Sequence, residues 1–274
     1  MILKLILVLL SFIFAYLFSI LPRRSMRRRM EKYHQTMFAH RGYHCIEKGI
    51  PENSMSSFQA AVDHNYGIEL DLHLTYDGHL VVFHDNTLDR ICHCSGVIET
   101  MTLAQLKKCR LSGTTETIPL FDDVLNLVDG KVPLLIELKI PKHSLKICEK
   151  TYELLKIYHG DYLVQSFNSL GIWWFRIHAP EILRGQLSSR LTKEKLKEPW
   201  LLCFLTEKLV CNLFSRPDFI SYNLLFQRDI SLKLAHGLFH APCAAWVLRS
   251  EKELEQCQKQ FCMYIFENFL PKQK

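Results

Sequence analysis

At 274 residues, with 48% hydrophobic and 23% charged residues, the chain is long enough to bury a large core, and its composition excludes an intrinsically disordered protein. Six of the 34 basic residues lie in residues 1–30, which contain no acid, so the rest of the chain has 28 basic and 28 acidic residues. The net charge of +6 therefore belongs to the N-terminal segment, and composition argues against nucleic-acid binding by the globular part.

Residues 1–22 have the pattern of a transmembrane signal anchor. The run from Leu5 to Leu21 is uncharged and close to the shortest helix that spans a bilayer, and arginines follow it in a basic linker over residues 23–35. A cleaved signal peptide has these features in the opposite order. We therefore expect a single-pass membrane protein whose globular domain is cytoplasmic and lies near anionic lipid. An interfacial helix that does not cross the bilayer is the alternative.

From residue 36 onward, short apolar runs alternate with amphipathic segments. The pattern predicts strands at 36–40, 66–75, 79–85, 133–140, 162–167, 182–188, 218–223, 243–248 and 262–268. It predicts helices at 53–65, 102–109, 120–128, 144–158, 169–178, 228–239 and 251–261, and a helical stretch around 192–214. The dipeptide Asp77-Gly78 indicates a hairpin between the second and third strands.

Apolar strands separated by helices are typical of a parallel sheet covered on both faces. About eight such repeats predict an α/β fold of the (β/α)8 TIM-barrel type over residues 36–274, with a small insertion at about 86–117. A doubly wound open sheet is the competing fold. Its dinucleotide-binding form carries GxGxxG in the first loop, which the sequence "AHRGYHCIEKG" lacks.

The ten cysteines do not form a regular framework. Cys92 and Cys94 flank His93, but a second pair with zinc-ligand spacing is missing from the sequence. Most other cysteines lie in apolar runs, where a thiol behaves as a small hydrophobe. We expect reduced thiols in a cytosolic domain.

Acidic residues interrupt two of the predicted strands. Glu69 and Asp71 lie two residues apart and so face the same side of the strand, as do Glu137 and Lys139. In a barrel this side is the interior, near the carboxyl ends of the strands where active sites lie. Isolated buried charges are costly, so something must compensate them. Carboxylate oxygens favour Ca²⁺ or Mg²⁺ over zinc, and a salt-bridge network with Lys139 is the alternative.

Histidines stand at the ends of two predicted strands, at His40 and His84. Their pKa values lie near neutrality, so the pair can supply one general base and one general acid. Arg41 offers a planar fork suited to a phosphate group. A single histidine at a strand end is more often structural, but its coincidence with an arginine and three acids favours catalysis.

The chain resembles the glycerophosphodiester phosphodiesterase family over about residues 36–271. The resemblance is carried by HRG at 40–42, PENS at 51–54, ELDLHLTYDG at 69–78, FHD at 83–85, LDR at 88–90, IELK at 136–139 and VQSFN at 164–168. It implies a TIM-barrel enzyme that cleaves a glycerophosphodiester to glycerol 3-phosphate and an alcohol.

The resemblance also implies roles for individual residues. A divalent ion would be bound by Glu69, Asp71 and Glu137, and the acid–base pair would be His40 and His84. Substrate-binding residues would be Arg41 and Lys139 near the phosphate, with Glu52 in the same polar cluster. Whether water or a neighbouring glycerol hydroxyl attacks the phosphorus stays open.

The sequence departs from the family in a late strand, which reads "AAWVLRS". Trp246 matches, but Leu248 and Arg249 replace small polar residues. Trp246 is a candidate for lining the substrate pocket, or an ordinary barrel-wall aromatic; Phe167 is a candidate for packing against the glycerol moiety, or a cap of the core. The departures concern the substrate, which is either a soluble glycerophosphodiester or, given the anchor, a lysophospholipid.

Other functions remain as alternatives. A lysophospholipase D, a phosphoinositide-specific phospholipase C or a sphingomyelinase D would also use a barrel and paired histidines. A binding protein that has lost its activity is a further alternative, but it predicts a missing catalytic residue, and the family positions are filled.

Overall fold

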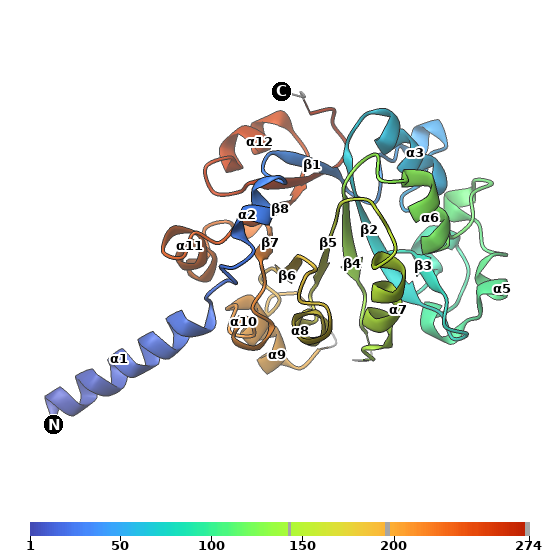
Figure 1. Cartoon of the computed structure of the whole chain (residues 1–274). Coiled ribbons are helices and arrows are strands. Elements are labelled where there is room, and N and C mark those ends of the chain that lie inside the picture. The colour runs from blue at the N-terminus through green and yellow to red at the C-terminus, as the bar shows by residue number, and fades with distance from the viewer. Residues whose placement is uncertain (142–143, 195–197, 272–274) are drawn as a thin grey trace.

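The chain folds around a closed barrel of eight parallel strands (Figure 1). This computed structural model describes residues 1–141, 144–194 and 198–271. In sequence order the barrel strands are β1 (Thr36–Ala39), β2 (Gly67–Leu74), β4 (Leu134–Leu138), β5 (Tyr162–Ser166), β6 (Arg184–Ser188), β7 (Phe219–Asn223), β8 (Cys243–Leu248) and β9 (Met263–Phe266). Pairing of β1 with both β9 and β2 closes the barrel, which confirms the predicted TIM-barrel fold.

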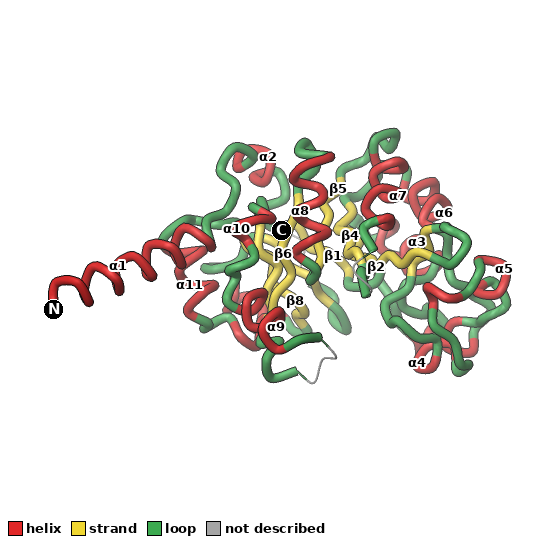
Figure 2. Tube along the Cα trace, turned by 90° about the horizontal axis from the view of Figure 1, so that it is seen from below, coloured by secondary structure: helices red, strands yellow, loops and turns green. Residues whose placement is uncertain are grey.

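Helices surround the strands, as the view from below shows (Figure 2). They are α3 (Met55–Asp63), α6 (Phe121–Val128), α7 (Lys146–Leu155), α8 (Ser169–His178), α9 (Trp200–Glu207), α10 (Asn212–Ser215), α11 (Ile230–Gly237) and α12 (Glu251–Cys257). Ser54 caps α3 by accepting a hydrogen bond from the backbone N–H of Ser57.

The prediction of one helical stretch around 192–214 is wrong. Thr192 and Lys193 lie in a turn, residues 195–197 lie outside the described part, and the helices α9 and α10 follow separately. Pro199 precedes the first residue of α9, where a proline disfavours helical conformation in the residue before it. Residues 272–274 of the predicted barrel domain also lie outside the described part.

Two apolar layers stabilise the barrel. The outward faces of the strands pack against the helices, for example through Ile68, Leu70 and Leu72 of β2. The amino-terminal half of the interior is filled by a separate cluster that includes Phe38, Leu135, Leu163, Leu183, Phe219, Ala244, Met263 and Ile265. Polar side chains of the interior are therefore confined to the other half, toward the carboxyl ends of the strands.

The predicted basic linker is partly folded onto the barrel. It contains the short helix α2 (Arg27–Glu31), and Met30 and Tyr33 join the interior cluster at the amino-terminal end of the strands. Arg29 Nη1 donates to the carbonyl oxygen of Glu181 (2.5 Å), and the backbone N–H of Arg23 donates to the carbonyl oxygen of Pro217 (2.9 Å). The segment thus closes one end of the barrel.

The predicted hairpin forms between β2 and the antiparallel strand β3 (Leu80–Val82). His84 lies two residues beyond β3, so it follows the strand instead of ending it. Residues after it form the short helices α4 (Asp89–Cys92) and α5 (Leu103–Leu106) and the 3₁₀ turns η2 (Ile98–Thr100) and η3 (Leu111–Gly113). A small apolar cluster of their own packs these elements together: Val81, Phe83, Leu88, Ile91, Ile98, Leu106, Leu111 and Ile118. Two further 3₁₀ turns elsewhere are η1 (Ile46–Lys48) and η4 (Leu224–Phe226).

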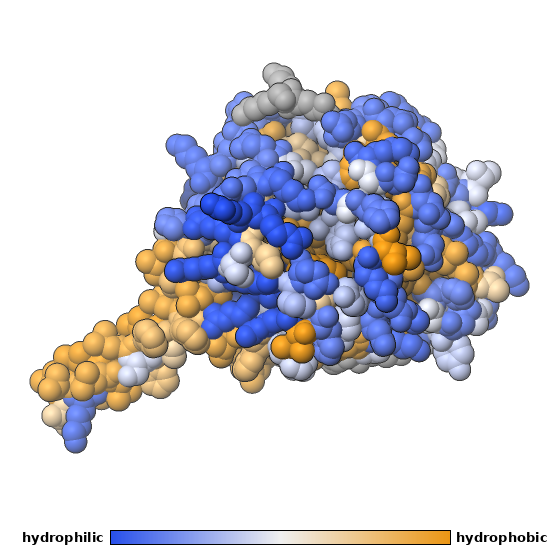
Figure 3. All heavy atoms as spheres, viewed as in Figure 1, coloured by the Kyte–Doolittle hydropathy of each residue, from blue (hydrophilic) through white to orange (hydrophobic). Residues whose placement is uncertain are grey.

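The helix α1 (Ile2–Ser19) projects from the barrel, and its hydrophobic surface continues onto the adjoining face (Figure 3). Its mean hydropathy is 2.4, and 6% of it is buried. By length and composition it is able to cross a membrane, a test that a signal sequence also passes. Its last turn is fixed to the barrel, where Tyr16 Oη donates to Ser231 Oγ (2.9 Å) and Ile20 is fully buried.

Gly185 in β6 tests how tightly the interior is packed. A Cβ atom there would lie 2.2 Å from Cε2 of Phe219, whose ring is fully buried. We expect Gly185→Ala to destabilise the fold by about 1–3 kcal/mol through overpacking, measured as a lower midpoint of thermal unfolding. Gly237→Ala, where nothing lies within 4 Å of the added atom, is the control. An unchanged midpoint for Gly185→Ala would mean that the ring has room to move.

Candidate active site

Three buried carboxylates meet inside the barrel, above the apolar cluster. Glu69 and Asp71 come from β2, Glu137 comes from β4, and the strand register places Asp71 beside Glu137. Their exposed fractions are 3%, 1% and 7%, and one oxygen from each lies within 4.8 Å of the others. The alternation of β2 explains the arrangement, because neighbouring Ile68, Leu70 and Leu72 face the helices.

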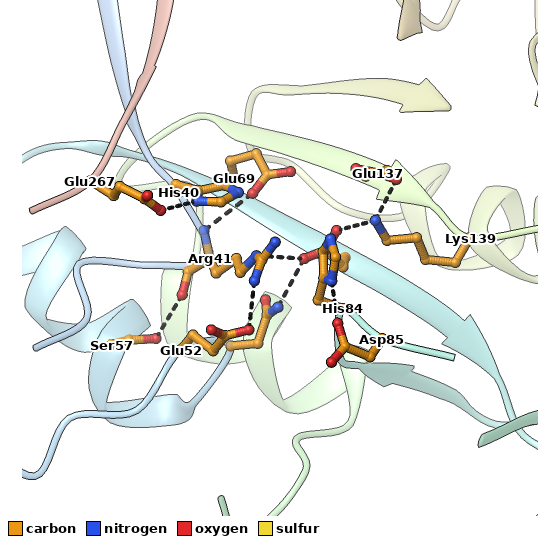
Figure 4. A network of polar contacts seen from close by, with 12 residues as sticks. His40, Arg41, Glu52, Ser57, Glu69, His84, Asp85, Glu137, Lys139 and Glu267 are labelled. Atoms are coloured by element: carbon orange, nitrogen blue, oxygen red, sulfur yellow. Dashed lines mark hydrogen bonds and ion pairs between the residues drawn. The ribbon is translucent and has the colours of Figure 1, made fainter. Parts of the chain in front are cut away.

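Two cations and two amides contact this acidic cluster, most of which Figure 4 shows. Lys139 Nζ lies 2.9 Å from Asp71 Oδ1 and 2.5 Å from Glu137 Oε1, and Arg41 Nε lies 3.7 Å from Asp71 Oδ2. Asn53 Nδ2 donates to Asp71 Oδ2 (2.9 Å). Asp71 is thus surrounded by positive charge and donors, whereas Glu69 accepts from neutral donors, the backbone N–H of Arg41 (3.1 Å) and Nε2 of Gln165 (3.5 Å).

These contacts separate the pKa values of the three acids. Burial acts to raise the pKa of Asp71, but Lys139, His84 and Arg41 outweigh it and hold the pKa well below its usual value. Burial, together with the charge of Asp71, raises the pKa of both Glu69 and Glu137. Burial opposes the charge of Lys139 as well, but the neighbouring carboxylates raise its pKa.

The donor set fits a hard divalent cation. Three buried carboxylates face two cationic side chains, so negative charge is in excess; burial first, and then the charges of Asp71 and Glu137, raise the pKa of Glu69. All three offer oxygen, the ligand atom that Ca²⁺ and Mg²⁺ take in proteins. Among the described residues, Glu69, Asp71 and Glu137 are the group of acidic, histidine or cysteine side chains close enough together to hold a metal ion.

His40 lies beside the cluster and bonds to an acid from the last strand. Its Nδ1 is 2.5 Å from Glu267 Oε2, and the other oxygen of Glu267 lies 2.7 Å from Arg249 Nη2. Burial lowers the pKa of His40 against the raising effect of Glu267. The pairing with His40 and Arg249 holds the pKa of Glu267 at about 2, against the raising effect of burial. A charged Glu267 therefore fixes Nδ1 of His40 as the protonated nitrogen, which leaves Nε2 for proton exchange.

His84 is oriented in the same way from the other side. Its Nδ1 is 2.6 Å from Asp85 Oδ1, and Asp85 also accepts from Arg90 Nε (2.6 Å). Arg90 extends to Glu52 Oε1 (2.8 Å), which in turn accepts from Arg41 Nη1 (2.8 Å). In Figure 4 the Arg41 side chain lies between the two histidines. One continuous polar network thus connects α4 of the insertion to the barrel interior.

The two aromatic candidates lie in contact with each other. The rings of Phe167 and Trp246 pack edge to face with their centroids 5.7 Å apart. Phe167 lines a cavity of about 920 Å³ together with His84, Glu137 and Lys139, whereas Trp246 packs beside the interior cluster. The structure therefore places Phe167 at the cavity wall and Trp246 behind it.

Sequence analysis did not assign the partners that orient the site. Asp85 and Asn53 lie inside the motifs FHD and PENS, and a search for carboxylates and amides next to candidate catalytic residues finds them. Glu267 is more than two hundred residues from His40 in sequence. Its position just after the last strand is the available signal, because all strand ends of a barrel converge.

Comparison with known proteins agrees with this geometry. The sequence model of the Glycerophosphoryl diester phosphodiesterase family matches residues 40–236. A glycerophosphodiester phosphodiesterase of Caldanaerobacter subterraneus subsp. tengcongensis is 32% identical over 185 residues, 62% of this chain and 72% of the relative. One from Bacillus altitudinis is 32% identical over 158 residues, 53% of this chain and 63% of the relative.

Solved structures share the fold. A phosphodiesterase of Oleispira antarctica in complex with the product sn-glycerol-3-phosphate has a TM-score of 0.70 and 23% identity, covering 86% of this chain and 94% of that one. The glycerophosphodiester phosphodiesterase of Thermotoga maritima has a TM-score of 0.65 and 19% identity, covering 85% and 94%. The chain therefore belongs to the glycerophosphoryl diester phosphodiesterase family and is a phosphoric diester hydrolase.

Proposed function

We propose that the protein hydrolyses glycerophosphodiesters to glycerol 3-phosphate and an alcohol, with a divalent cation and two histidines. The observation that carries the proposal is the acidic cluster of Glu69, Asp71 and Glu137. Its neighbours His40 and His84 are each oriented by a carboxylate. Oxygen ligands favour Ca²⁺ or Mg²⁺ as the ion.

A cation bound by the acidic cluster would neutralise the charge that develops on the phosphoryl oxygens. Arg41 is placed to do the same from the protein, since its guanidinium is held by Glu52 at 2.8 Å and presents a planar set of donors. Lys139 is fixed between Asp71 and Glu137 and adds a second positive charge close by.

The histidines move the protons. His40 is buried, and its lowered pKa favours the neutral ring, which suits a general base that removes a proton through Nε2 from the attacking oxygen. His84, oriented by Asp85, then protonates the oxygen of the leaving alcohol. Phosphorus gains one P–O bond and loses another, and the proton count balances.

The reaction is tested by supplying glycerophosphocholine and coupling the release of glycerol 3-phosphate to a dehydrogenase. We expect turnover with Ca²⁺ or Mg²⁺ and its loss with a chelator. Failure to release glycerol 3-phosphate from any glycerophosphodiester, with either ion, would contradict the proposal.

Glu69→Gln tests the assigned metal ligand. We expect activity to fall by about 10²-fold or more. Binding of Ca²⁺ or Mg²⁺ should raise the thermal midpoint of the parent enzyme, and this rise should be lost in the variant. Because the folded-state pKa of Glu69 is raised, its charged form opposes folding at neutral pH. Without metal, the variant should therefore have a thermal midpoint equal to or above that of the parent. The difference between the two midpoints should shrink as the pH falls.

Glu255→Gln removes an exposed carboxylate from α12 and is the matched control. It should leave activity and the metal-induced rise in the midpoint as they are. A Glu69→Gln enzyme that kept full activity with no added metal would show that this residue has another role.

Glu267→Gln tests the proton-transfer role of His40. The carboxylate of Glu267 favours the protonated ring, so its removal should lower the pKa of His40 further. If His40 acts as the base, the acidic limb of the kcat/KM profile should move to lower pH. A shift of the alkaline limb instead would assign His40 as the acid, and an unmoved profile would exclude it from proton transfer.

A second candidate function is the same cleavage on a lysophospholipid, the lysophospholipase D reaction. The observation in its favour is the exposed apolar helix α1, which would hold the enzyme at a lipid surface. We propose that α1 spans the membrane and that the arginines after it keep the barrel cytoplasmic. The full chain should then stay in the membrane pellet after extraction with alkaline carbonate, and its barrel should be protected from proteases added outside the cell.

A further inference from the structure

The cavity at the active site extends well beyond the polar groups. The cavity has a volume of about 920 Å³, and His84, Glu137 and Lys139 form one end of it. From there it passes Phe167 and runs along the helices α8, α9 and α10. The side chains on that path are mainly apolar, among them Ile140, Leu170, Trp173, Leu202 and Phe214, and the carboxylates Glu194 and Glu198 also line it.

The far end of this cavity reaches the part of the barrel to which α1 is attached. Phe214 lies on α10, and the next turn of chain carries Arg216, whose Nη1 donates to the carbonyl oxygens of Phe18 (2.9 Å) and Leu21 (3.1 Å). The Arg216 guanidinium also lies 4.6 Å from the centre of the Phe18 ring. Figures 1 and 2 both show α10 beside α8 and toward α1.

Large apolar side chains are exposed around the outer rim of the cavity. Of the lining residues, Phe214, Leu170 and Trp173 are 66%, 47% and 40% exposed, and Trp200 and Leu201, which precede the lining residue Leu202 on α9, are 64% and 60% exposed. Exposed apolar groups at this density are unusual for a surface that faces only water, and they mark a binding or membrane-contact surface. The rim and α1 therefore offer one continuous region suited to lipid.

We propose that the cavity along α8, α9 and α10 binds a single acyl chain of a lipid glycerophosphodiester whose phosphate lies at Lys139 and the acidic cluster. This inference rests on the proposed function and names its substrate class. A volume of about 920 Å³ falls at the upper end of the range for small-molecule sites. The apolar path is continuous with the catalytic end, so phosphate and chain of one molecule are accommodated together.

The placement argues against a protein segment as the occupant. A peptide seated along α8 and α9 would extend over Phe167 toward Glu137 and Lys139 and would obstruct the catalytic end. An acyl chain that belongs to the substrate does not obstruct the catalytic end, because its burial in the cavity positions the phosphodiester of the same molecule there. Binding energy from such a remote group contributes to the rate at the reacting centre.

The first experiment is a chain-length series. Full-length protein in nanodiscs receives 1-acyl glycerophosphocholines from butyryl to decanoyl, below their micelle concentrations, with glycerophosphocholine as the compound without a chain. We expect kcat/KM to rise by up to about fourfold for each methylene that enters the cavity. The ratio of decanoyl to unacylated kcat/KM is the readout.

Leu202→Asp and Leu170→Asp place a charge in the cavity wall at partly exposed positions, so both should fold. Each should lower the ratio of decanoyl to unacylated kcat/KM at least tenfold. A general loss of activity lowers both kcat/KM values equally and leaves the ratio unchanged. Ile157→Asp, exposed and outside the cavity, should keep the parent ratio. A flat series in the parent with normal glycerophosphocholine turnover overturns the acyl-chain site and leaves the proposed function standing.

The second measurement does not need turnover. A brominated acyl chain in a lysophosphatidylcholine should quench the fluorescence of Trp173, which lines the cavity. Trp173→Phe should remove most of the quenching. Trp174→Phe is the matched control, because the neighbouring Trp174 stacks on His178 (4.6 Å) and packs against Phe175 on the core side of α8. Equal quenching in both variants would overturn the proposal even in an inactive preparation, whereas absent turnover of every substrate would count against the proposed function alone.

Discussion

Compensation of buried negative charge is the constraint on which the site depends. Three carboxylates desolvated within one half of a barrel repel each other, and their charged forms persist only where partners repay the cost. Asp71 has its partners in Lys139, Arg41 and Asn53, and its pKa is depressed. Glu69 and Glu137 have fewer, and burial raises their pKa values. The imbalance leaves a place for a cation and fixes where substrate phosphate can be neutralised.

Much of this arrangement is predictable because strand geometry is simple. The two-residue period of β2 separates Glu69 and Asp71 from the apolar residues between them, and the barrel fold then directs both inward. A local pattern also predicted the hairpin at Asp77-Gly78. In each case the information lies within a few residues of sequence.

Other features depend on distant parts of the chain and were not predicted. The bond between His40 and Glu267 joins the first and last strands, and its formation depends on closure of the barrel. The region 192–214 has a helical pattern, yet α9 begins only after Pro199, and Leu209, with a φ of 58°, lies between the end of α9 and the start of α10. The basic linker contains Met30 and Tyr33, whose burial among interior residues is set by packing that its local sequence does not reveal.

The folded linker also holds α1 in a defined position relative to the cavity. A flexible tether would let the barrel rotate freely beneath an anchor. Here Arg23 and Arg29 bond to carbonyl groups at the amino-terminal end of the barrel, and Arg216 holds the last turn of α1 beside α10. The orientation of the barrel relative to α1 is therefore fixed at two points. Phe214 on α10 lines the cavity and Arg216 two residues later bonds to Phe18 of α1, so the cavity wall and α1 lie on the same part of the barrel.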